Sequence, residues 1–342
     1  MSEITTHERP GVYSSYDASS LTAAASGGGA VCIVANGGTH TGGPYTWVSY
    51  SRAVADVGVC ALSKLAHLAL KNGAGLVYGI PGGGDYTAAF EIAAAIADVA
   101  VVICDSTELT VQQALRDMVQ TCSEARKERI AVVAGAKDES ADDLIARAAA
   151  LNHERVVLVA PPVSGGDGTA CAAAVAGAIA GNTDPALPLN GVELRDIGGL
   201  SAVYEDGDID LLVRGGVTPL EPMGGSGSIV RAVTTRTTTG GAADATWREL
   251  TTILVADEVI PGIRSALRSR FSRVKNTEQT RGAIRSQVVM ELQSRVNREI
   301  IDSYEDVTVT PSETDPTVCL VEFAFTVTHG LNQIWLSAHI TV

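Results

Sequence analysis

The chain of 342 residues has few basic side chains, few aromatic side chains and no paired cysteine motif. Its net charge of −14 argues against nucleic acid or an anionic membrane surface as a partner. No apolar run reaches the length that spans a bilayer, so we expect no membrane insertion. The six cysteines are scattered through apolar segments without a C-x-x-C, so we expect reduced, buried thiols. The opening residues, MSEITTHERPG, lack the basic and apolar regions of a Sec-type signal.

Complete motifs for nucleotide or metal chemistry are also missing. The loop GIPGGGDY, residues 79–86, follows an expected strand and opens an expected helix, as phosphate-binding loops do. It lacks the Lys and Ser/Thr of a Walker A motif. The loop PPVSGGDGTA, residues 161–170, also lies between an expected strand and an expected helix, and it also lacks those Walker A residues. The histidines lie far apart, and no H-E-x-x-H or Cys/His cluster occurs. We therefore predict no catalytic residue, no cofactor and no metal ligand, and we keep a nucleotide-binding α/β protein as one alternative.

Two segments resemble motifs of subtilisin-like proteases. GTACAAAVAGAIA, residues 168–180, is similar to the helix that carries the nucleophilic serine, but Ala170 stands at the serine position and has no hydroxyl. GGTHTGG, residues 37–43, is similar to the segment of the catalytic histidine, but Gly37 stands at that position and His40 matches only a later histidine. The nearest aspartate motif, at Asp105, follows this segment instead of preceding it. The second alternative is therefore a catalytically dead or degenerate subtilisin-like α/β hydrolase.

What the sequence does contain is a regular alternation of strands and helices over residues 30–231. Segments such as AVCIVAN, VAVVICDS and ERVVLVAPP are apolar throughout and are separated by helical patterns. This alternation predicts an α/β fold with a central, mostly parallel sheet that helices cover on both faces. Residues 232–332 read differently, with a Thr-rich extended segment, two expected helices at 257–271 and 280–302, and then strands, which predicts a separate α+β domain.

Both ends of the chain contain strand patterns outside these domains. Residues 334–342 alternate without interruption, with Ile334, Leu336, Ala338, Ile340 and Val342 on one face, which is typical of a half-buried strand. Near the other end, Val12, Tyr13, Ser14, Ser15 and Tyr16 follow a Pro-Gly break and are expected to form a short strand. We therefore expect an extended N-terminal arm at residues 1–29 and a C-terminal arm at residues 333–342.

Several segments resemble contractile tail sheath proteins of bacteriophages and R-type bacteriocins. The segment ERPGVYSSYD resembles the R-P-G-V-Y opening of that family. In the family's order there follow RVVLVAPP, AVAGAIAGNTDPALPLNGVEL, EDGDIDLLVRGGVTPLE, SIVRAVTT, WRELTTILVADEVIPGIRSALRSRF and VEFAFTVTHGLNQIWLSAHITV. The chain departs from the family at SRVKNTEQTRG, residues 272–282, where members often have Gly-Lys-Asn.

The resemblance implies a structural, non-enzymatic subunit that stacks in rings around an inner tail tube and contracts to drive the tube through a bacterial envelope. Its central domain is expected to resemble a subtilisin-like sheet without the triad, in agreement with Ala170, and its second domain is expected to face the tube. The implied partners are further copies of the chain, the tube protein, and baseplate and tail terminator proteins. The implied location is a phage virion tail or a related contractile particle, assembled in the cytoplasm of the host bacterium.

In that family both arms add strands to sheets of neighbouring subunits. The N-terminal donor would be Val12, Tyr13, Ser14, Ser15 and Tyr16, and the C-terminal donor would be Ile334, Trp335, Leu336, Ala338, Ile340 and Val342. The acceptor strands would be the segments DVTVT and CLVEFAFTV, with Val307, Val309, Val321, Phe323 and Phe325. The resemblance thus implies that the α+β domain is completed by other copies of the chain.

Basic residues are concentrated in one part of this acidic chain. Residues 264–298 carry nine basic and two acidic side chains, whereas residues 301–342 carry six acidic and no Lys or Arg side chains. If the helix expected at 257–271 continues through Lys275, then Arg264, Arg268 and Lys275 share one face, because eleven residues are close to three helical turns. We predict that this stripe contacts an acidic tube surface; the alternative is a solvated helix face.

Overall fold

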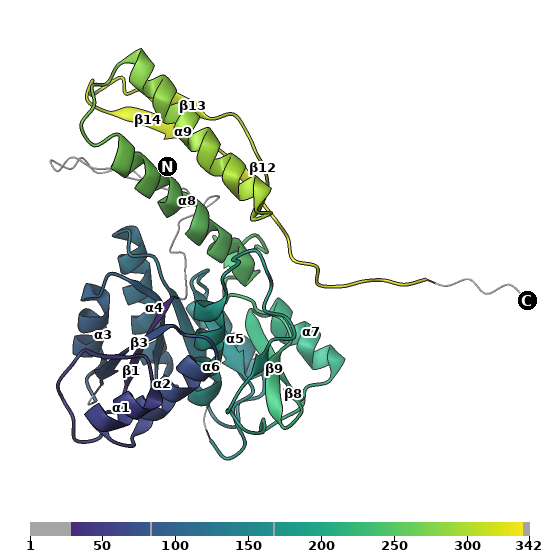
Figure 1. The fold of residues 1–342 in the computed structure, drawn as a ribbon. Coiled ribbons are helices and arrows are strands. Elements are labelled where there is room, and N and C mark those ends of the chain that lie inside the picture. The colour runs from purple at the N-terminus through teal and green to yellow at the C-terminus, as the bar shows by residue number, and fades with distance from the viewer. Residues whose placement is uncertain (1–28, 83, 167, 338–342) are drawn as a thin grey trace, which may run out of the picture.

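The computed structural model describes residues 29–82, 84–166 and 168–337, and shows an α/β body from which a narrower helical part projects (Figure 1). The body contains one nine-stranded sheet in the order β2-β3-β1-β4-β5-β6-β8-β9-β7. The run from β3 to β8 is parallel, while β2, β9 and β7 pair antiparallel at the ends. The predicted mostly parallel central sheet is therefore confirmed. The strands are β1 (Ala30–Ala35), β2 (Tyr45–Trp47), β3 (Leu76–Pro81), β4 (Val99–Cys104), β5 (Ile130–Ala134), β6 (Val156–Ala160), β7 (Glu193–Leu194), β8 (Val217–Met223) and β9 (Ser226–Ile229).

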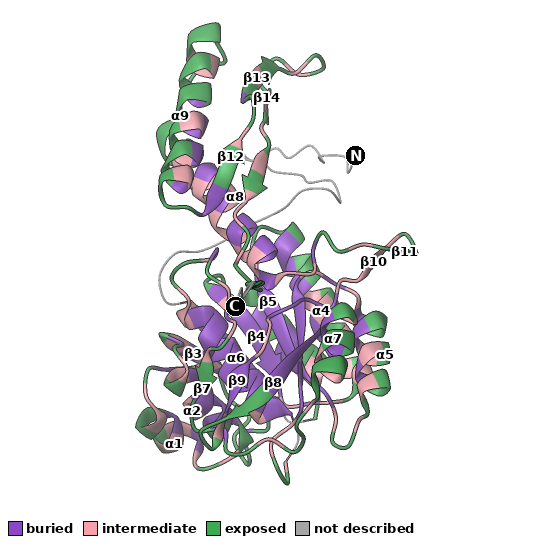
Figure 2. Ribbon diagram, turned by 90° about the vertical axis from the view of Figure 1, so that its right-hand side faces the viewer, coloured by how far each residue is buried: buried purple, intermediate pink, exposed green. Residues whose placement is uncertain are grey.

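Helices cover both faces of this sheet, which explains why the inner strands are apolar at every position. In β1, Val31 and Ile33 point into one core with α2 and α6, whereas Cys32 and Val34 point into the other with α3, α4 and α5. Figure 2 shows these buried strands as the inner layer of the body. The helices of the body are α1 (Tyr50–Val57), α2 (Ala61–Lys71), α3 (Tyr86–Ala95), α4 (Leu109–Glu124), α5 (Ala141–Leu151), α6 (Thr169–Gly181) and α7 (Asp206–Arg214).

Helices α2 and α6 pack with their backbones in contact, because glycine stands where they cross. A Cβ atom at Gly177 would overlap the main-chain carbonyl of Ala69. One turn further along, Gly181 lies against Gly73 in the same way, with Cβ-to-Cα separation of only 2.8 Å. Since α6 is buried along nearly its whole length, it has no free side toward which it can shift.

We predict that Gly177→Ala destabilises the body, because the added methyl group pushes α6 away from α2. The expected loss in the free energy of unfolding is about 1–3 kcal/mol, the usual cost of overpacking a core. Gly207→Ala in α7 is the matched control, since nothing lies within 4 Å of its Cβ position and a helical Gly-to-Ala change stabilises by up to about 1 kcal/mol. Urea unfolding of both variants tests this, and equal midpoints would contradict the proposed helix contact.

The projecting part is built on two long helices, α8 (Leu250–Arg270) and α9 (Glu278–Asn297). The expected helices at 257–271 and 280–302 exist, but α8 begins earlier and α9 ends earlier than the pattern predicted. The first turns of α8 belong to the core of the body through Leu250 and Ile253, while Ile263 and Leu267 belong to a separate core with α9. One helix therefore connects both cores. Between body and α8, the Thr-rich segment forms the small hairpin of β10 (Thr238–Thr239) and β11 (Ala242–Ala243).

A two-stranded antiparallel ribbon covers these helices. Strand β12 (Ile301–Tyr304) pairs with β15 (Phe325–Val327), and β13 (Thr308–Pro311) pairs with β14 (Cys319–Glu322). The amide of Glu305 donates to the carbonyl of Ala324 at 2.9 Å and joins the two pairs into one ribbon. Within the described ranges, no third strand pairs with either edge of it. The α+β character predicted for the C-terminal region is thus observed.

Candidate functional site

The carboxyl edge of the parallel strands is where α/β sheets usually bind ligands, and here side chains of the chain itself occupy it. Asp105, which follows β4, accepts hydrogen bonds from the amide of Asn36 and from the hydroxyl of Tyr86, both at 2.7 Å. Burial, together with that hydrogen bond and the Asp105 charge, raises the pKa of Tyr86, so its hydroxyl remains a structural donor. These contacts join the ends of β1 and β4 to the start of α3 and leave Asp105 no role as a triad member.

The residues that stand at the two protease-like positions, Ala170 and Gly37, are packed and carry no reactive side chain. Ala170 lies half-buried in the first turn of α6, and Gly37 is packed against the ring of Pro81, where a Cβ would be 2.9 Å from the Pro81 Cβ. In the described part of the chain, no three His, Cys, Asp or Glu side chains are grouped to hold a metal ion. Likewise, none of the described helices combines the length and apolar character needed to span a membrane.

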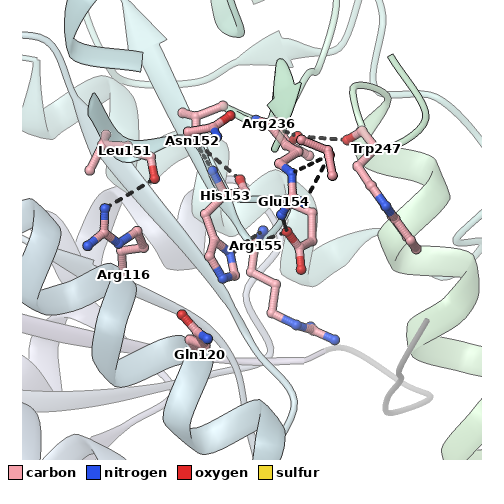
Figure 3. A network of polar contacts seen from close by, with 12 residues as sticks. Arg116, Gln120, Leu151, Asn152, His153, Glu154, Arg155, Arg236 and Trp247 are labelled. Carbon is pink, nitrogen blue, oxygen red and sulfur yellow. Dashed lines mark hydrogen bonds and ion pairs between the residues drawn. The ribbon is translucent and has the colours of Figure 1, made fainter. Parts of the chain in front are cut away.

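The joint between the body and α8 begins with a polar network that precedes the helix (Figure 3). In this network the connection between α5 and β6 lies against the segment that follows β9. There His153 donates its amide to the hydroxyl of Thr235 at 3.0 Å, and that hydroxyl donates to the carbonyl of His153 at 3.1 Å. Arg236 pairs with Glu154 at 2.8 Å. Both partners of this ion pair are less than one-fifth exposed, so water screens the pair little.

Two buried ion pairs fix α8 to the body. Arg155, at the start of β6, contacts Asp257 at 3.0 Å, and Arg264 contacts Glu128 at 2.9 Å. The side chains of Arg155 and Glu128 are 2% and 4% exposed. Because these pairs lie about two turns apart on α8, they fix the direction of the helix as well as its position.

The predicted cationic stripe is corrected by this geometry. Helix α8 ends at Arg270 and does not continue to Lys275, so the three predicted residues do not share one helical face. Arg264 points to Glu128 of the body and is not available to a partner surface. The sequence pattern missed both facts because the break after Arg270 has neither Gly nor Pro, and because Glu128 lies 136 residues away.

Burial raises the pKa of Asp257 to about 7; Arg155 opposes this shift, and the nearby Glu128 and Glu154 add to it. In the folded protein the carboxyl is therefore neutral at pH values where it is ionised in the unfolded chain. Between about pH 4 and 7, each pH unit then removes about 1.4 kcal/mol of folding free energy through this group. Below about pH 4 the carboxyl is neutral in both the folded and the unfolded protein, so pH has no effect through it. Above about pH 7 it is ionised in both, so the folding free energy falls no further.

We predict that Asp257→Asn removes this part of the pH dependence. Relative to the variant, wild-type protein should lose stability as pH rises from 4 to 7, by about 4 kcal/mol in total, and no more above pH 7. Urea unfolding across that pH series measures the difference, with the exposed Asp138→Asn as control. A constant difference between wild type and Asp257→Asn over the series would show that the carboxyl is already ionised in the joint.

The structure brings the predicted acceptor residues together. Val307 is buried, and Val309, Val321, Phe323 and Phe325 are half-buried against the core of α8 and α9. Alternate residues of the second ribbon strand point inward, so the ribbon has one apolar face, and the rings of Phe323 and Phe325 stack at 6.4 Å. The backbone edges on either side of this face are what an added strand can contact.

The predicted donor residues that the structure describes are not on the ribbon of their own chain. Ile334, Trp335 and Leu336 are 80%, 91% and 92% exposed and belong to no strand. Ala338, Ile340 and Val342 lie outside the described residues, as do Val12, Tyr13, Ser14, Ser15 and Tyr16. A run of large apolar side chains in water is unusual and marks a binding segment.

Exposed basic residues gather at the end of the helical pair that is remote from the body (Figure 1). Arg268 lies in the last turn of α8, and Arg273 and Lys275 lie in the loop to α9; all three are exposed. No described acidic side chain forms an ion pair with them. Asn276 fastens this loop to the ribbon by donating to the carbonyls of Pro316 and Val318, at 2.9 and 3.2 Å.

Comparison with known proteins assigns these features to a family. The phage tail sheath protein central domain matches residues 79–235, and the phage tail sheath C-terminal domain matches residues 242–341. The chain belongs to the phage tail sheath family. This sheath protein is accordingly a structural protein, as predicted, and neither the hydrolase nor the nucleotide-binding alternative is supported.

Individual relatives agree with the assignment. The tail sheath protein of Bacillus phage SP01 is 27% identical over 252 residues, which are 71% of this chain but 43% of the relative, so the chain spans less than half the length of that protein. A protein in the structure of the anti-feeding prophage helical sheath in the contracted state has the same fold, with a TM-score of 0.70 at 15% identity over 98% of this chain and 99% of that one. The sheath tail protein of Desulfitobacterium hafniense gives a TM-score of 0.66 at 14% identity over 93% of this chain and 100% of that one.

Proposed function

We propose that this sheath protein polymerises as stacked rings around an inner tail tube and contracts to drive the tube through a bacterial envelope. Family membership supports the sheath role, and the likeness to a chain of a contracted sheath supports a fold that can contract. The observation that carries the proposal is the combination, in one chain, of an open-edged ribbon and an exposed apolar segment at residues 334–336. Assembly would take place in the host cytoplasm, with baseplate and tail terminator proteins bounding the polymer.

The C-terminal segment of one copy would complete the ribbon of another. A two-stranded ribbon is marginally stable in water, and its unpaired N–H and C=O groups are a template for further strands. Residues 334–342 supply alternating apolar side chains that would extend the apolar face over α8 and α9. The N-terminal segment around Val12 and Tyr16 would supply a second strand. The α+β domain, here residues 232–332, would then be completed between copies, with arms at residues 1–29 and 333–342.

One donated strand contributes little net free energy. Five apolar side chains give about 10 kcal/mol when buried, and backbone hydrogen bonds add about 4 kcal/mol at roughly 1 kcal/mol each. Ordering nine residues costs about 14 kcal/mol. The net free energy of binding one arm is therefore close to zero. A subunit that binds through several arms in a growing ring is bound more strongly. This favours growth on a template over association of free subunits.

We also infer that the body retains the layout of a subtilisin-like domain without its chemistry. Helix α6 follows a parallel strand and is buried in the centre of the body, as the nucleophile-bearing helix is in such enzymes. The residue at the nucleophile position is Ala170, and Asp105 is bonded to Asn36 and Tyr86. The helix would thus serve packing alone.

The basic end of the helical pair would face the inner tube. Arg268, Arg273 and Lys275 replace the stripe that the sequence pattern suggested, since Arg264 is paired with Glu128. Exposed ion pairs are worth about 0–1 kcal/mol each and are screened by salt. Such a contact holds when repeated around each ring and is released when the ring expands.

We expect deletion of residues 333–342 to block sheath polymers while leaving the folded monomer intact, because the described cores are formed without that segment. Sedimentation and electron microscopy measure polymer, and circular dichroism measures folding. Normal polymers from the truncated protein would rule out donation by this segment.

We expect simultaneous reversal of Arg268, Arg273 and Lys275 to Glu to weaken assembly on tubes. The proposed acidic tube surface would then repel this end of the helical pair, most strongly at low salt. The control is reversal of Lys64, Lys71 and Lys137, which are exposed on the body and give the same change in net charge. Co-sedimentation with tubes across a salt series compares the two. Equal binding by both variants would assign the basic end another role.

A further inference from the structure

The C-terminal segment contacts the body through Gly330 and Asn332. The chain leaves β15 at Val327, and Gly330 then lies directly on the ring of Pro188. A Cβ at Gly330 would be 2.8 Å from the Pro188 Cγ. Two residues further, the side-chain oxygen of Asn332 accepts a hydrogen bond from the side-chain amide of Asn190 at 2.7 Å. These contacts tie residues 330–332 to a loop 142 residues earlier in the sequence.

The loop that carries Pro188 and Asn190 is held in place by its own hydrogen bonds and by contacts with both cores. Residues 182–190 connect α6 to β7 and are braced internally, with Asn182 donating to the carbonyl of Leu187 at 3.1 Å and Asp184 accepting from the amide of Ala186 at 3.0 Å. Leu189 is buried in the core of the body, and Ala186 is buried in the core of α8 and α9. The loop is therefore anchored in both cores, and its position relative to the ribbon is fixed.

The support acts at two points only. Gly330 and Asn332 make the contacts above, whereas Leu331 between them is 73% exposed and Ile334, Trp335 and Leu336 are at least 80% exposed. Gly330 does not have a positive φ angle, so its backbone tolerates other residues and only the ring of Pro188 excludes a side chain there. The absence of a side chain at residue 330 therefore serves this contact and not a turn.

We propose that Pro188 and Asn190 form a seat for the C-terminal segment, which fixes the point and direction at which the segment leaves one copy of the chain to reach a second copy. The inference rests on the proposed strand donation. Holding residues 330–332 restricts the search of the exposed end to about 33 Å around a fixed point, the reach of ten extended residues. Such preorganisation lowers the ordering cost of binding, which is the largest unfavourable contribution for a donated strand. In the polymer, Pro188 and Asn190 keep their contacts with residues 330–332.

A disulfide across the seat tests this directly. The Cβ position at residue 330 is 3.1 Å from the Pro188 Cβ, so Pro188→Cys with Gly330→Cys needs only a small shift to reach the disulfide separation of about 3.5–4.5 Å. We expect the oxidised double variant to give the wild-type yield of sheath polymer. Polymers that form only after reduction would overturn the proposal, because the seat would then have to open.

Disrupting the seat should have the opposite effect. We expect Gly330→Leu to lower polymer yield roughly tenfold, which corresponds to about 1.4 kcal/mol per contact, while Gly207→Leu, whose Cβ position is open, should assemble normally. Wild-type polymer yield from Gly330→Leu would overturn the seat; if this variant fails to fold, the disulfide variant decides.

The truncation of residues 333–342 separates this inference from the proposed function. If truncated chains polymerise, strand donation itself is wrong. If truncation blocks polymers but both seat variants assemble as wild type, donation stands and only the seat is wrong.

Discussion

The unpaired backbone edge of the β12–β15 ribbon is the constraint on which the proposed assembly depends. The nine-stranded sheet of the body ends in short strands, three residues in β2 and two in β7, which offer little to a foreign strand. The ribbon strands are also short, three or four residues each, but β12 and β13 pair with β15 and β14 along one continuous ribbon whose inner face is apolar. Among the described residues, no further strand pairs with its N–H and C=O groups on either side. The same chain carries Ile334, Trp335 and Leu336 in water. In the proposed assembly these two features would compensate each other between copies.

Helix α8 makes the ribbon and the body one mechanical unit. Its first turns lie in the core of the sheet, its later turns lie in the core under the ribbon, and the pairs of Arg155 with Asp257 and of Arg264 with Glu128 fix its direction. Removing one partner of the buried Arg264–Glu128 pair is expected to cost about 3–5 kcal/mol. In the proposed assembly, a displacement of the ribbon by an arm from another copy would therefore be passed to the body. This is the rigidity that a contracting lattice needs in each subunit.

Local sequence patterns predicted the parts of the fold that local physics determines. Apolar runs such as AVCIVA predicted the parallel sheet, and Ala170 excluded nucleophilic chemistry. Contacts between distant residues were not predictable from periodicity. Arg155 and Asp257 are 102 residues apart, and the only signal was a charge at the edge of an otherwise apolar strand and another within an apolar helix.

The charge argument failed for a related reason. Spacing placed Arg264, Arg268 and Lys275 on one face, but the helix stops at Arg270 and Glu128 takes up Arg264. Periodicity describes which face a residue lies on and carries no information about which distant carboxylate meets that face. The end of α8 also lacks the Gly or Pro that usually marks a helix end in sequence.

Electron cryo-microscopy of the assembled polymer at side-chain resolution tests the central claim most directly. We predict that residues 334–342 of one copy form a strand along an open edge of the ribbon of another copy, with Ile334 and Leu336 facing the core of α8 and α9. A polymer in which both ribbon edges remain unpaired, or in which residues 334–342 pair with the ribbon of their own chain, would contradict assembly by strand donation.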